Sequence, residues 1–511
     1  MKNYFTLLFL VFINLFFCQT QYLDSSFGNN GTVITDAGYN SVDEAYTVAT
    51  TASQKILVAG KGSDANFINF SLIIRYNNEG SIDTSFGENG KFIIDNLYRQ
   101  SFISDIKVLS SGKILVLGGA FYNDPNDCLL YITRINENGT LDLTFGSNGY
   151  KTLNNSSGKN MPREMFLDND ENIYIINEIK IQSNGNMNKF CIYKLKNNGT
   201  TDTTFANNGV TNTYDGSNPT SYIYSTGNIL VATSEYPNDS KYLTLYKFSQ
   251  NGNLDTTFNN GGSRIINYNN LFLDINSILI PSEDKIIITA STIDFSPVKK
   301  FVITKLNLDG SFDLNFGNGG QKDFPFANNI DPSSMGIGKK SILTKDNKII
   351  FTGILSAYDL AKYHFIVRKT DLEGNIDNSF GENGQVIIDF GNSSDDFLYN
   401  SILQKDGKII CVGETANNFN SSDIAIARLN NSLLSSSETT NYKEKLIINT
   451  LVKNYLLFAK KINNLRYQIF DFSGKVIKTG FVYNSKLDLS GLKKGIYLIK
   501  VAHETAKFTK E

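Results

Sequence analysis

An aspartate recurs seven times along this chain at the same place in a short phrase, which first reads LDSSFGNNG at residues 23–31. A carboxylate among asparagine and backbone oxygens could bind a hard cation such as calcium. It could equally accept hydrogen bonds from backbone N–H groups two or three residues further on and so hold a turn. Each phrase offers one certain carboxylate, whereas a calcium site usually needs more than one. We therefore favour a structural role, with calcium as the alternative.

A phenylalanine follows each aspartate by three residues, and a glycine follows it by seven. The intervals between successive aspartates are 59, 59, 60, 53, 58 and 64 residues. We interpret the aspartate as a turn cap, the phenylalanine as a wedge between packed units and the glycine as a residue that permits positive φ. The motif residues are Asp24, Phe27, Gly31, Asp83, Phe86, Gly90, Asp142, Phe145, Gly149, Asp202, Phe205, Gly209, Asp255, Phe258, Gly262, Asp313, Phe316, Gly320, Asp377, Phe380 and Gly384.

A basic residue stands eight positions before each aspartate from the second copy onward, and another occupies the equivalent place in the last unit. A ring of such residues could bind anionic ligands. Lysine and arginine on an exposed edge strand also discourage pairing with another chain, which is the interpretation we favour, together with an ion pair to a motif aspartate. The residues are Arg75, Arg134, Lys194, Lys247, Lys305, Lys369 and Arg428.

Other residues that could do chemistry are scarce. The chain has two histidines, His364 and His503, so the repeats hold no His-based triad or His-rich metal cluster. Its fifty acidic residues allow many carboxylate pairs of the glycosidase type, but the sequence selects none of them. We therefore assign no catalytic, cofactor-binding or metal-binding residue. Three cysteines lie in apolar runs and are expected to be buried rather than disulfide-bonded, namely Cys128, Cys191 and Cys411.

Each repeat contains four apolar runs of four to eight residues, bounded by Gly, Asn or Asp. Such runs predict short strands, and radial repetition of four-stranded units is the architecture of a propeller. The sequence thus predicts an all-β fold, a seven-bladed β-propeller of four-stranded blades. We expect the run that carries the basic residue to be outermost and the phrase to lead from one blade into the next. Whether the first and last blades share strands is left open.

The phrase G-x-L-D-x-x-F-G-x-x-G at intervals near sixty, with strands such as DGKIICVGE between, resembles the delta-60 repeat of bacterial surface proteins. The resemblance covers residues 22–434 and implies a β-propeller. Departures are local, such as Ala206 and Asn259 in place of the glycine after phenylalanine. The segments DAGYNSVDEAY and GGAFYNDPNDCLL vary most between repeats, and we expect them on the face opposite the phrase, as the binding surface.

The repeat ends before a polar linker, residues 435–444, and residues 445–511 have a different rhythm. The blocks YQIFDFSGKVI and LDLSGLKKGIYLIKV, with a basic tail, resemble the type A C-terminal sorting domain of the type IX secretion system of Bacteroidetes. The resemblance implies a small β-sandwich, recognition by the type IX translocon and export to the medium or the outer cell surface. The residues that carry it include Gly474, Gly495, Tyr497, Lys507 and Lys510.

Residues 1–20 contain Lys2 followed by an apolar run, which predicts a cleaved signal peptide; a lipidated Cys18 is the alternative. No later stretch has the length and apolarity of a transmembrane span. With 48 basic and 50 acidic residues and a net charge of −2, the chain has no field to attract nucleic acid or an acidic membrane. We expect a monomer without a cofactor.

Three hypotheses of function fit these observations. The first is a secreted or surface-attached propeller that binds an extracellular protein or glycan without catalysis. The second is an extracellular polysaccharide hydrolase or lyase that uses acidic residues at one rim of the propeller. The third is a purely structural adhesin. The sequence favours a protein that is not an enzyme, because no catalytic cluster stands out.

Overall fold

The computed structural model describes residues 22–38, 41–94, 100–121, 128–154, 158–181, 188–235, 242–268, 273–282, 284–292, 299–327, 335–356, 362–391, 394–418, 421–431, 451–458, 464–471, 475–501 and 504–511. The chain divides into two compact units, Met1–Asn431 and Ser432–Glu511. The predicted signal peptide, the predicted linker and Gly474 lie outside the described residues. Within the described residues, no helix has the length and apolar character needed to cross a membrane.

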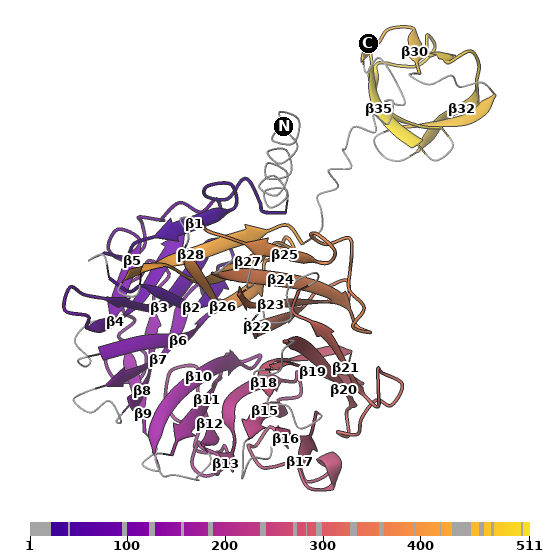
Figure 1. The fold of residues 1–511 in the computed structure, drawn as a ribbon. Helices are drawn as coiled ribbons and strands as arrows, with labels where there is room; N and C mark the ends of the chain where they lie inside the picture. Colours follow the sequence, from indigo (N-terminus) through magenta and orange to yellow (C-terminus); the bar gives the residue numbers. More distant parts are fainter. Residues whose placement is uncertain are drawn as a thin grey trace, which may run out of the picture. The chain divides into compact units, whose positions relative to one another are not determined.

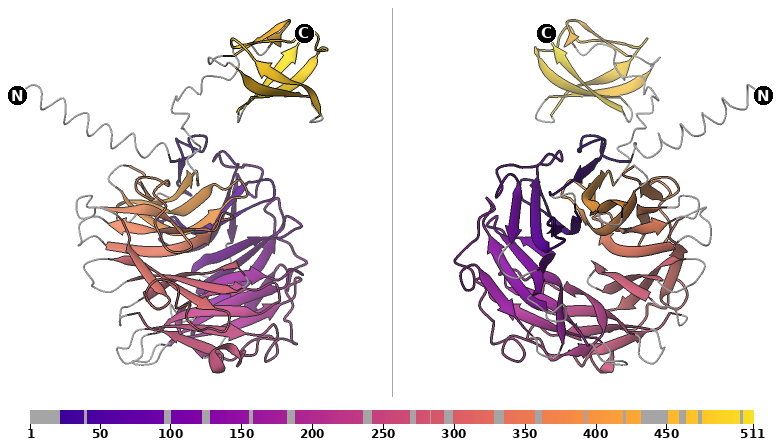
Figure 2. Two further views of the ribbon diagram at one scale, coloured as in Figure 1. Left: turned by 90° about the vertical axis from the view of Figure 1, so that its right-hand side faces the viewer. Right: turned by 60° about the vertical axis from the view of Figure 1, so that its left-hand side comes forward.

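The first unit contains seven four-stranded antiparallel sheets, which form a ring (Figures 1 and 2). The inner strands, one per blade, are β2 (Glu44–Thr50), β6 (Gln100–Val108), β10 (Lys159–Leu167), β14 (Ser217–Ile223), β18 (Leu273–Ser282), β22 (Met335–Leu343) and β26 (Asp395–Leu403). The second strands are β3 (Ile56–Ser63), β7 (Ile114–Phe121), β11 (Ile173–Lys180), β15 (Ile229–Glu235), β19 (Lys285–Thr292), β23 (Lys348–Ser356) and β27 (Ile409–Asn418). We number the blades 1 to 7 in this order.

The third strands are β4 (Asn69–Tyr76), β8 (Cys128–Ile135), β12 (Lys189–Leu195), β16 (Tyr242–Phe248), β20 (Lys300–Asn307), β24 (Tyr363–Asp371) and β28 (Ser421–Leu429). The outer strands are β5 (Lys91–Ile94), β9 (Tyr150–Leu153), β13 (Tyr214–Asp215), β17 (Ser263–Ile266), β21 (Gln321–Pro325), β25 (Gln385–Ile388) and, for blade 7, β1 (Thr32–Thr35). The one helical element among the described residues is a 3-10 turn, η2 (Phe258–Asn260). The predicted fold class, a seven-bladed propeller of four-stranded blades, is confirmed.

The strand order within a blade differs from the prediction in one respect. The run that carries the basic residue is the third strand, paired on both sides, and the short run after the phrase is outermost. The phrase therefore turns the chain from the third strand to the outer strand of the same blade and does not lead between blades. The basic residues do not protect an edge. The edges are instead kept short, two to five residues, which limits the backbone available for pairing with another chain.

The ring closes by sharing strands, which answers the question left open by the sequence. The N-terminal strand β1 pairs antiparallel with β28, with Thr32 opposite Ala427 and Thr35 opposite Ile424. Blade 7 thus combines three strands from the end of the propeller with one from its beginning. This seam between β1 and β28 joins residues nearly four hundred positions apart, so its stability decides whether the ring stays closed.

The second unit has its own apolar core. A five-stranded sheet has the order β29 (Leu451–Val452), β35 (Glu504–Lys510), β34 (Gly495–Val501), β31 (Leu465–Phe470) and β32 (Val476–Val482). A second sheet pairs β30 (Tyr455–Leu457) with β33 (Lys486–Asp488). Tyr497 is buried, stacks on Phe508 with ring centroids 5.7 Å apart, and donates a hydrogen bond to the Lys493 carbonyl. The small C-terminal β-sandwich is confirmed.

The remaining described sorting-domain residues lie on two interior strands of the larger sheet, β34 and β35. Gly495 begins β34, and Lys507 is exposed on β35. Lys510 is largely buried, and its Nζ donates to the Glu511 carbonyl at 2.6 Å. The structure thus leaves Lys507 as the member of the predicted basic tail that faces solvent.

Candidate functional site

The repeated phrase forms a contact between neighbouring blades. In blade 1, Asp83 Oδ1 accepts hydrogen bonds from the N–H and the hydroxyl of Ser85, at 3.2 and 2.6 Å. Asp83 Oδ2 lies 2.6 Å from both Lys55 Nζ and Arg75 Nε. Although burial alone would raise it, these donors and the Arg75 charge hold the pKa of Asp83 below its usual range. Both oxygens thus already have protein partners.

The same arrangement recurs at all seven phrases. Each motif aspartate accepts a hydrogen bond from the N–H two residues on, at 3.1 to 3.3 Å. All seven have a lowered pKa. Six pair with the basic residue of the third strand, whereas Lys305 pairs with Glu373. This geometry favours the turn-capping interpretation over a calcium site, because the carboxylates face cationic side chains.

The motif phenylalanine lies between two blades. Phe86 is fully buried and packs in one core cluster with Ile73 of blade 1 and Ile103 of blade 2. The Arg75 guanidinium lies 4.5 Å from the Phe86 ring centroid and also donates to the Glu137 carbonyl of the next blade. We call this set an interblade lock: the motif aspartate, the motif phenylalanine and the basic residue of the third strand.

The motif glycine allows the turn that closes each lock. Gly90 has φ of +89°, and a Cβ placed there would lie 2.2 Å from Ile82 Cγ2. Its N–H donates to the Phe86 carbonyl at 2.8 Å. A larger residue would therefore be strained and would clash with Ile82. None of the lock residues lines the cavity at the centre of the ring.

The seven inner strands line a central channel, where a cavity of about 360 Å³ lies. Every inner strand carries a β-bulge at the same level, because its pairing with the second strand gains one extra residue there. Bulges re-aim side chains and are frequent beside functional sites. In six blades the extra residue lines the channel, and in blade 4 the bulge contains two residues, Asn218 and Pro219, which both line it. We call these residues the channel ring: Tyr46, Ser104, Arg163, Asn218, Pro219, Asn276, Lys339 and Tyr399.

Two further cavities adjoin the channel. They lie at the end of the blades where the second strand turns into the third and where the chain crosses from one blade to the next. One, of about 450 Å³, is lined by Phe102, Phe121 and Arg163 among others. The other, of about 690 Å³, is lined by Tyr363, Phe397 and several charged residues. Both cavities lie at the end of the channel that is on the face opposite the phrase, where the sequence predicted the binding surface. We call this end the mouth of the channel. Much of the variable segments themselves lies outside the described residues.

Aromatic rings and carboxylates lie together at this mouth. The rings of Tyr46 and Tyr399 meet edge to face, with centroids 5.2 Å apart. The Tyr399 hydroxyl donates to Glu414 Oε1 at 2.6 Å, and the Tyr46 hydroxyl donates to Glu44. Burial and the Glu44 carboxylate raise the pKa of Glu414. Lys61 Nζ lies 3.2 Å from Glu44, so the wall presents aromatic faces beside paired charges.

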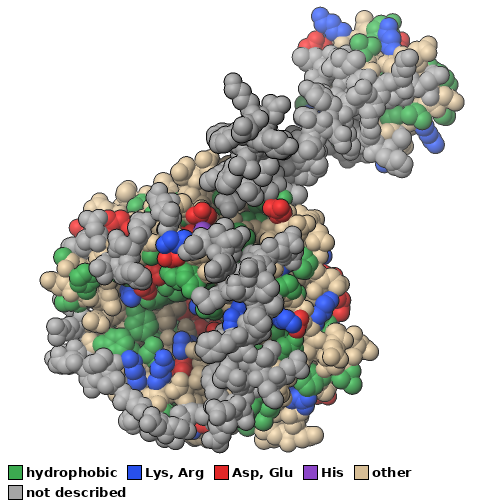
Figure 3. Space-filling model, in the orientation of Figure 1, with side chains coloured by type: hydrophobic (Ala, Val, Ile, Leu, Met, Phe, Trp, Pro, Cys, Tyr) green, Lys and Arg blue, Asp and Glu red, His purple; other side chains and the backbone are tan. Residues whose placement is uncertain are grey.

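A second group of charges lies across the channel. Arg163 Nε donates to the buried Glu178 at 2.6 Å, and Arg163 Nη2 donates to Asn218 Oδ1 at 2.9 Å. Burial raises the pKa of Asp274, and burial lowers the pKa of Lys339 despite the charge of Asp274. These side chains are held in place by one another, so the channel wall is preorganised for polar contacts with a ligand. Figure 3 shows basic, acidic and apolar side chains around a hollow on one face of the propeller.

The sequence reasoning did not find the channel ring. A bulge adds one residue to a strand without changing the apolar pattern on either side, so no local signal marks it. The signal that exists is positional. When the seven inner strands are aligned on the second strands that follow them, the ring residues share a column, which in blade 4 contains Pro219, with Asn218 one position before it. Tyr46 and Tyr399 both follow an aspartate by three residues.

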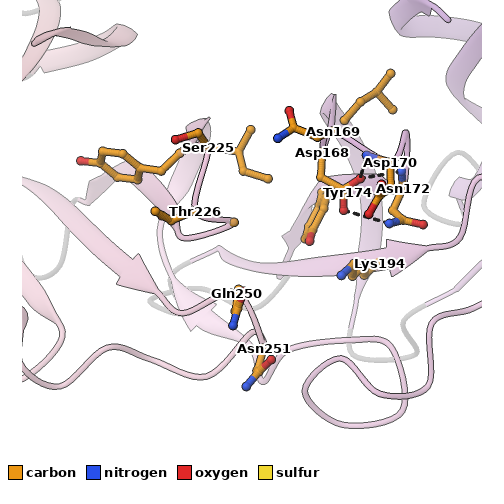
Figure 4. A pocket seen from close by; sticks show the side chains of 14 residues that line it. Asp168, Asn169, Asp170, Asn172, Tyr174, Lys194, Ser225, Thr226, Gln250 and Asn251 are labelled. Atoms are coloured by element: carbon orange, nitrogen blue, oxygen red, sulfur yellow. Dashed lines mark hydrogen bonds between the residues drawn. The ribbon is translucent and has the colours of Figure 1, made fainter. Parts of the chain in front are cut away.

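Another cavity, of about 640 Å³, lies on the phrase face between the hairpins of blades 3 and 4 (Figure 4). Its polar groups are engaged with one another. Asn172 donates twice to Asp168, at 2.8 and 2.9 Å, and Lys194 belongs to the blade 3 lock with Asp202. Asn172 occupies the position of Lys55 in blade 1, and this shorter side chain leaves the space open. We regard the cavity as part of the lock region rather than as a ligand site.

Comparison with known proteins agrees with both units of the fold. Residues 452–511 match the secretion system C-terminal sorting domain. Residues 54–86, 109–145 and 404–432 match the domain of unknown function (DUF5122) beta-propeller. The chain is therefore a secreted β-propeller with a type IX sorting tail. The tail directs it through the type IX secretion system to the cell surface or the medium. Cys128, Cys191 and Cys411 are buried and form no disulfide within the described part of the chain, as the sequence predicted.

Solved structures with a similar arrangement are distant in sequence. A protein of unknown function from Dyadobacter fermentans is 10% identical with a TM-score of 0.40, over 78% of this chain and 98% of that one. A polysaccharide lyase, an ulvan lyase, is 10% identical with a TM-score of 0.42, over 77% and 95%. An endo-arabinase from Bacteroides thetaiotaomicron is 13% identical with a TM-score of 0.31, over 52% and 93%. No curated protein matches the chain. Likenesses this distant do not bear on activity.

Proposed function

We propose that this protein is an extracellular binding propeller that holds a glycan at the mouth of its central channel, without catalysing a reaction on it. The observation that carries the proposal is the channel ring. Seven bulges at one level turn a mixed set of tyrosine, arginine, lysine, asparagine and serine side chains into one cavity. Such bulges are typical of positions that serve a site rather than the stability of a sheet.

The chemistry of the mouth suits a sugar. A saccharide presents apolar C–H faces, which pack on aromatic rings, and a rim of hydroxyls, which need donors and acceptors at fixed positions. Tyr46 and Tyr399 supply the ring faces. Arg163 and Asn218 are linked by a hydrogen bond and present polar groups beside them. Because these side chains are already held by neighbours, little conformational entropy is lost when a ligand binds.

The test is a glycan array probed with the full-length mature protein, followed by calorimetry on the best ligand. We expect Tyr46→Ala and Tyr399→Ala each to weaken binding by at least roughly fivefold, since one aromatic contact contributes about 1 kcal/mol or more. Tyr150→Ala is the matched control, because Tyr150 is half-buried on the outer strand β9 and does not line the channel. Absence of any glycan ligand, or equal loss in all three variants, would contradict the proposal.

One observation favours a second function, hydrolysis or elimination on an extracellular polysaccharide. Glu414 has a raised pKa and lies beside Glu44 at the same mouth, and both line one cavity. A carboxyl group with a raised pKa next to a second carboxyl group is the pattern of an acid and base pair. Turnover of a polysaccharide by the wild type, abolished in Glu414→Gln but not in Glu137→Gln on the phrase face, would establish this function instead.

A further inference from the structure

Two crossings between blades share a pattern of residues that the binding site does not explain. The crossing from β1 to β2 reads DAGYNSVDEAY at residues 36–46, and the crossing from β25 to β26 reads DFGNSSDDFLY at residues 389–399. Both begin with aspartate, have glycine third, serine sixth and aspartate eighth, and end on a tyrosine of the channel ring. The first joins blade 7 to blade 1 and so spans the seam at which the ring closes.

The two crossings also make the same local hydrogen bonds. Asp36 Oδ1 accepts from the N–H two residues on at 2.7 Å, and Asp43 Oδ2 accepts from the N–H that follows Asp36, also at 2.7 Å. The corresponding bonds to Asp389 and Asp396 measure 2.7 and 3.2 Å. Each crossing therefore holds its two aspartates in a fixed arrangement.

At the seam, the carboxylate of Asp423 lies close to those of Asp36 and Asp43. One oxygen each from Asp36, Asp43 and Asp423 lie within 4.8 Å of one another. Asp43 is fully buried, and its Oδ1 has no hydrogen-bond partner among the described residues. A buried carboxylate oxygen without a donor costs free energy unless a positive group completes it. Burial, with the charges of Asp36 and Asp423, raises the pKa of Asp43 to about 7 even though Lys91 is near.

We propose that Asp36, Asp43 and Asp423 bind a divalent cation of the calcium class at the seam of the propeller. Three carboxylates supply the hard oxygen ligands that calcium prefers, and the buried Asp43, one of whose oxygens lacks a donor among the described residues, contributes to the site from the interior. Calcium takes about six to eight oxygens, and waters fill the remaining positions because Asp36 is exposed and Asp423 is half-buried. This site uses none of the repeated phrase aspartates.

The three ligands come from three segments that must meet when the ring closes. Asp36 follows the closing strand β1, Asp423 lies on its partner β28, and Asp43 precedes the first inner strand β2. Two backbone bonds already join these segments, from the Asp43 N–H to the Ser422 carbonyl at 2.9 Å and from the Ser422 N–H to the Ser41 carbonyl at 3.2 Å. A cation bound here ties the closing strand to both the first and the last blade, so it stabilises the closed ring.

The crossing between blades 6 and 7 provides a built-in control. There the position of Asp423 is taken by His364, which also stands five residues before the basic residue of its lock. His364 Nδ1 lies 3.5 Å from Asp396 Oδ2 and 3.9 Å from Asp389 Oδ1. An imidazole nitrogen is a poor ligand for calcium, which takes oxygen donors. The two crossings thus have the same backbone arrangement but different affinities for this ion.

The experiment uses full-length mature protein stripped with a chelator and titrated with calcium chloride by calorimetry, with thermal unfolding in parallel. We expect one calcium per chain and an unfolding temperature that rises with the logarithm of calcium concentration above Kd. Asp43→Asn and Asp36→Asn should each weaken calcium binding at least about tenfold and remove most of the thermal shift. Asp396→Asn, the matched change in the other crossing, should keep both.

Asp36 is exposed, so Asp36→Asn is expected to fold even if Asp43→Asn does not, and circular dichroism checks both. The proposal is overturned if the wild type shows neither calcium heat nor a thermal shift. It is also overturned if binding persists in Asp36→Asn, or if about seven ions bind per chain without regard to Asp36 and Asp43, which would place calcium at the repeated phrases. None of these outcomes depends on whether the channel binds a glycan.

Discussion

The interblade locks are of two kinds, and their distribution around the ring is uneven. The locks of blades 7, 1 and 2 contain arginine, namely Arg428, Arg75 and Arg134, and each of their aspartates pairs with a second cation, a lysine. The locks of blades 3 to 6 contain lysine in place of arginine, and in blades 3 and 4 Asn172 and Asn228 also replace the second cation. The arginine locks thus adjoin the seam, and the weakest locks lie away from it.

The difference follows from the shapes of the two side chains. Arg428 pairs with Asp24 at 2.7 Å, donates to the Asn78 backbone carbonyl of the next blade and lies 4.5 Å from the Phe27 centroid. Lys247 reaches Asp255 at 3.3 Å and lies 5.6 Å from the Phe258 centroid. A planar guanidinium can do all three at once, whereas an ammonium is a single point charge. The seam, which covalent continuity does not close, has the more demanding lock.

The largest effect on stability should come from removing the motif phenylalanine, which both kinds of lock contain. Phe145→Ala in an arginine lock and Phe205→Ala in a lysine lock should each reduce the free energy of unfolding by about 3 to 5 kcal/mol, since both rings are buried between blades. Denaturant unfolding followed by circular dichroism measures this change. A change near zero at either position would contradict the wedge role, and a large difference between them would show that the basic residue controls the packing.

Replacing the basic residue should destabilise the protein more in an arginine lock than in a lysine lock. Arg428→Ala leaves the largely buried Asp24 with Lys408 as its remaining cation and should cost about 3 kcal/mol. Lys247→Ala breaks a pair with partial exposure on both sides and should cost about 1 kcal/mol or less. The same unfolding measurement applies, with the exposed Lys405→Ala as a control that changes little. Equal costs for the two variants would remove the distinction drawn between the seam and the rest of the ring.

The sequence predicted the blades better than their internal order. Seven copies of Phe and Gly at fixed spacing predicted the ring, because a repeat with an apolar residue every sixty positions must bury it against a neighbour. The order of strands was predicted wrongly, since a turn around Asp83 is compatible with either a return to the same blade or a crossing to the next. The edge role of Arg75 was wrong for the same reason, although its ion pair with Asp83 was expected and is present.

The candidate site was less predictable than the fold. The opposite face was expected to bind ligands because its segments vary, but Tyr46 and Arg163 were not singled out. Their importance depends on bulges and on the meeting of seven strands at one level, which no single repeat reveals. The cluster of carboxylates that includes Asp36 and Asp423 could not be predicted from any local stretch of sequence either. These two residues are almost four hundred positions apart and come together only because β1 pairs with β28.

A smaller effect should come from exchanging the two cations. Arg134→Lys keeps the charge near Asp142 but loses the hydrogen bonds to the Asn197 carbonyl, at 2.8 Å, and to Thr144 Oγ1, at 3.2 Å. We expect a cost of about 1 to 2 kcal/mol, measured by unfolding, because each net hydrogen bond contributes roughly 0.5 to 1.5 kcal/mol. The reverse change, Lys194→Arg, should be neutral or stabilising. A neutral Arg134→Lys would show that charge alone accounts for the lock.

The smallest effect should appear on acidification. The two kinds of lock should lose their stabilising ion pairs at different pH values. Although burial opposes it, hydrogen bonds from Lys408 and Ser26 and the Arg428 charge lower the pKa of Asp24 to about 2. A folded-state pKa below the unfolded value of about 3.9 means that the carboxylate stabilises the fold fully above pH 4 and loses this effect as the pH falls towards 2.

Hydrogen exchange measured by mass spectrometry between pH 5 and 2 would follow both regions in one experiment. The Thr257 hydroxyl and Lys247 also lower the pKa of Asp255, but its one lysine lies 3.3 Å away, so protection of β17 should fail at a higher pH than protection of β1. High salt should widen the gap, because it screens the partly exposed Lys247 pair more than the buried Arg428 pair. If β1 loses protection first, the seam depends on something other than its arginine lock, and the Asp36 and Asp43 carboxylates become the first groups to examine.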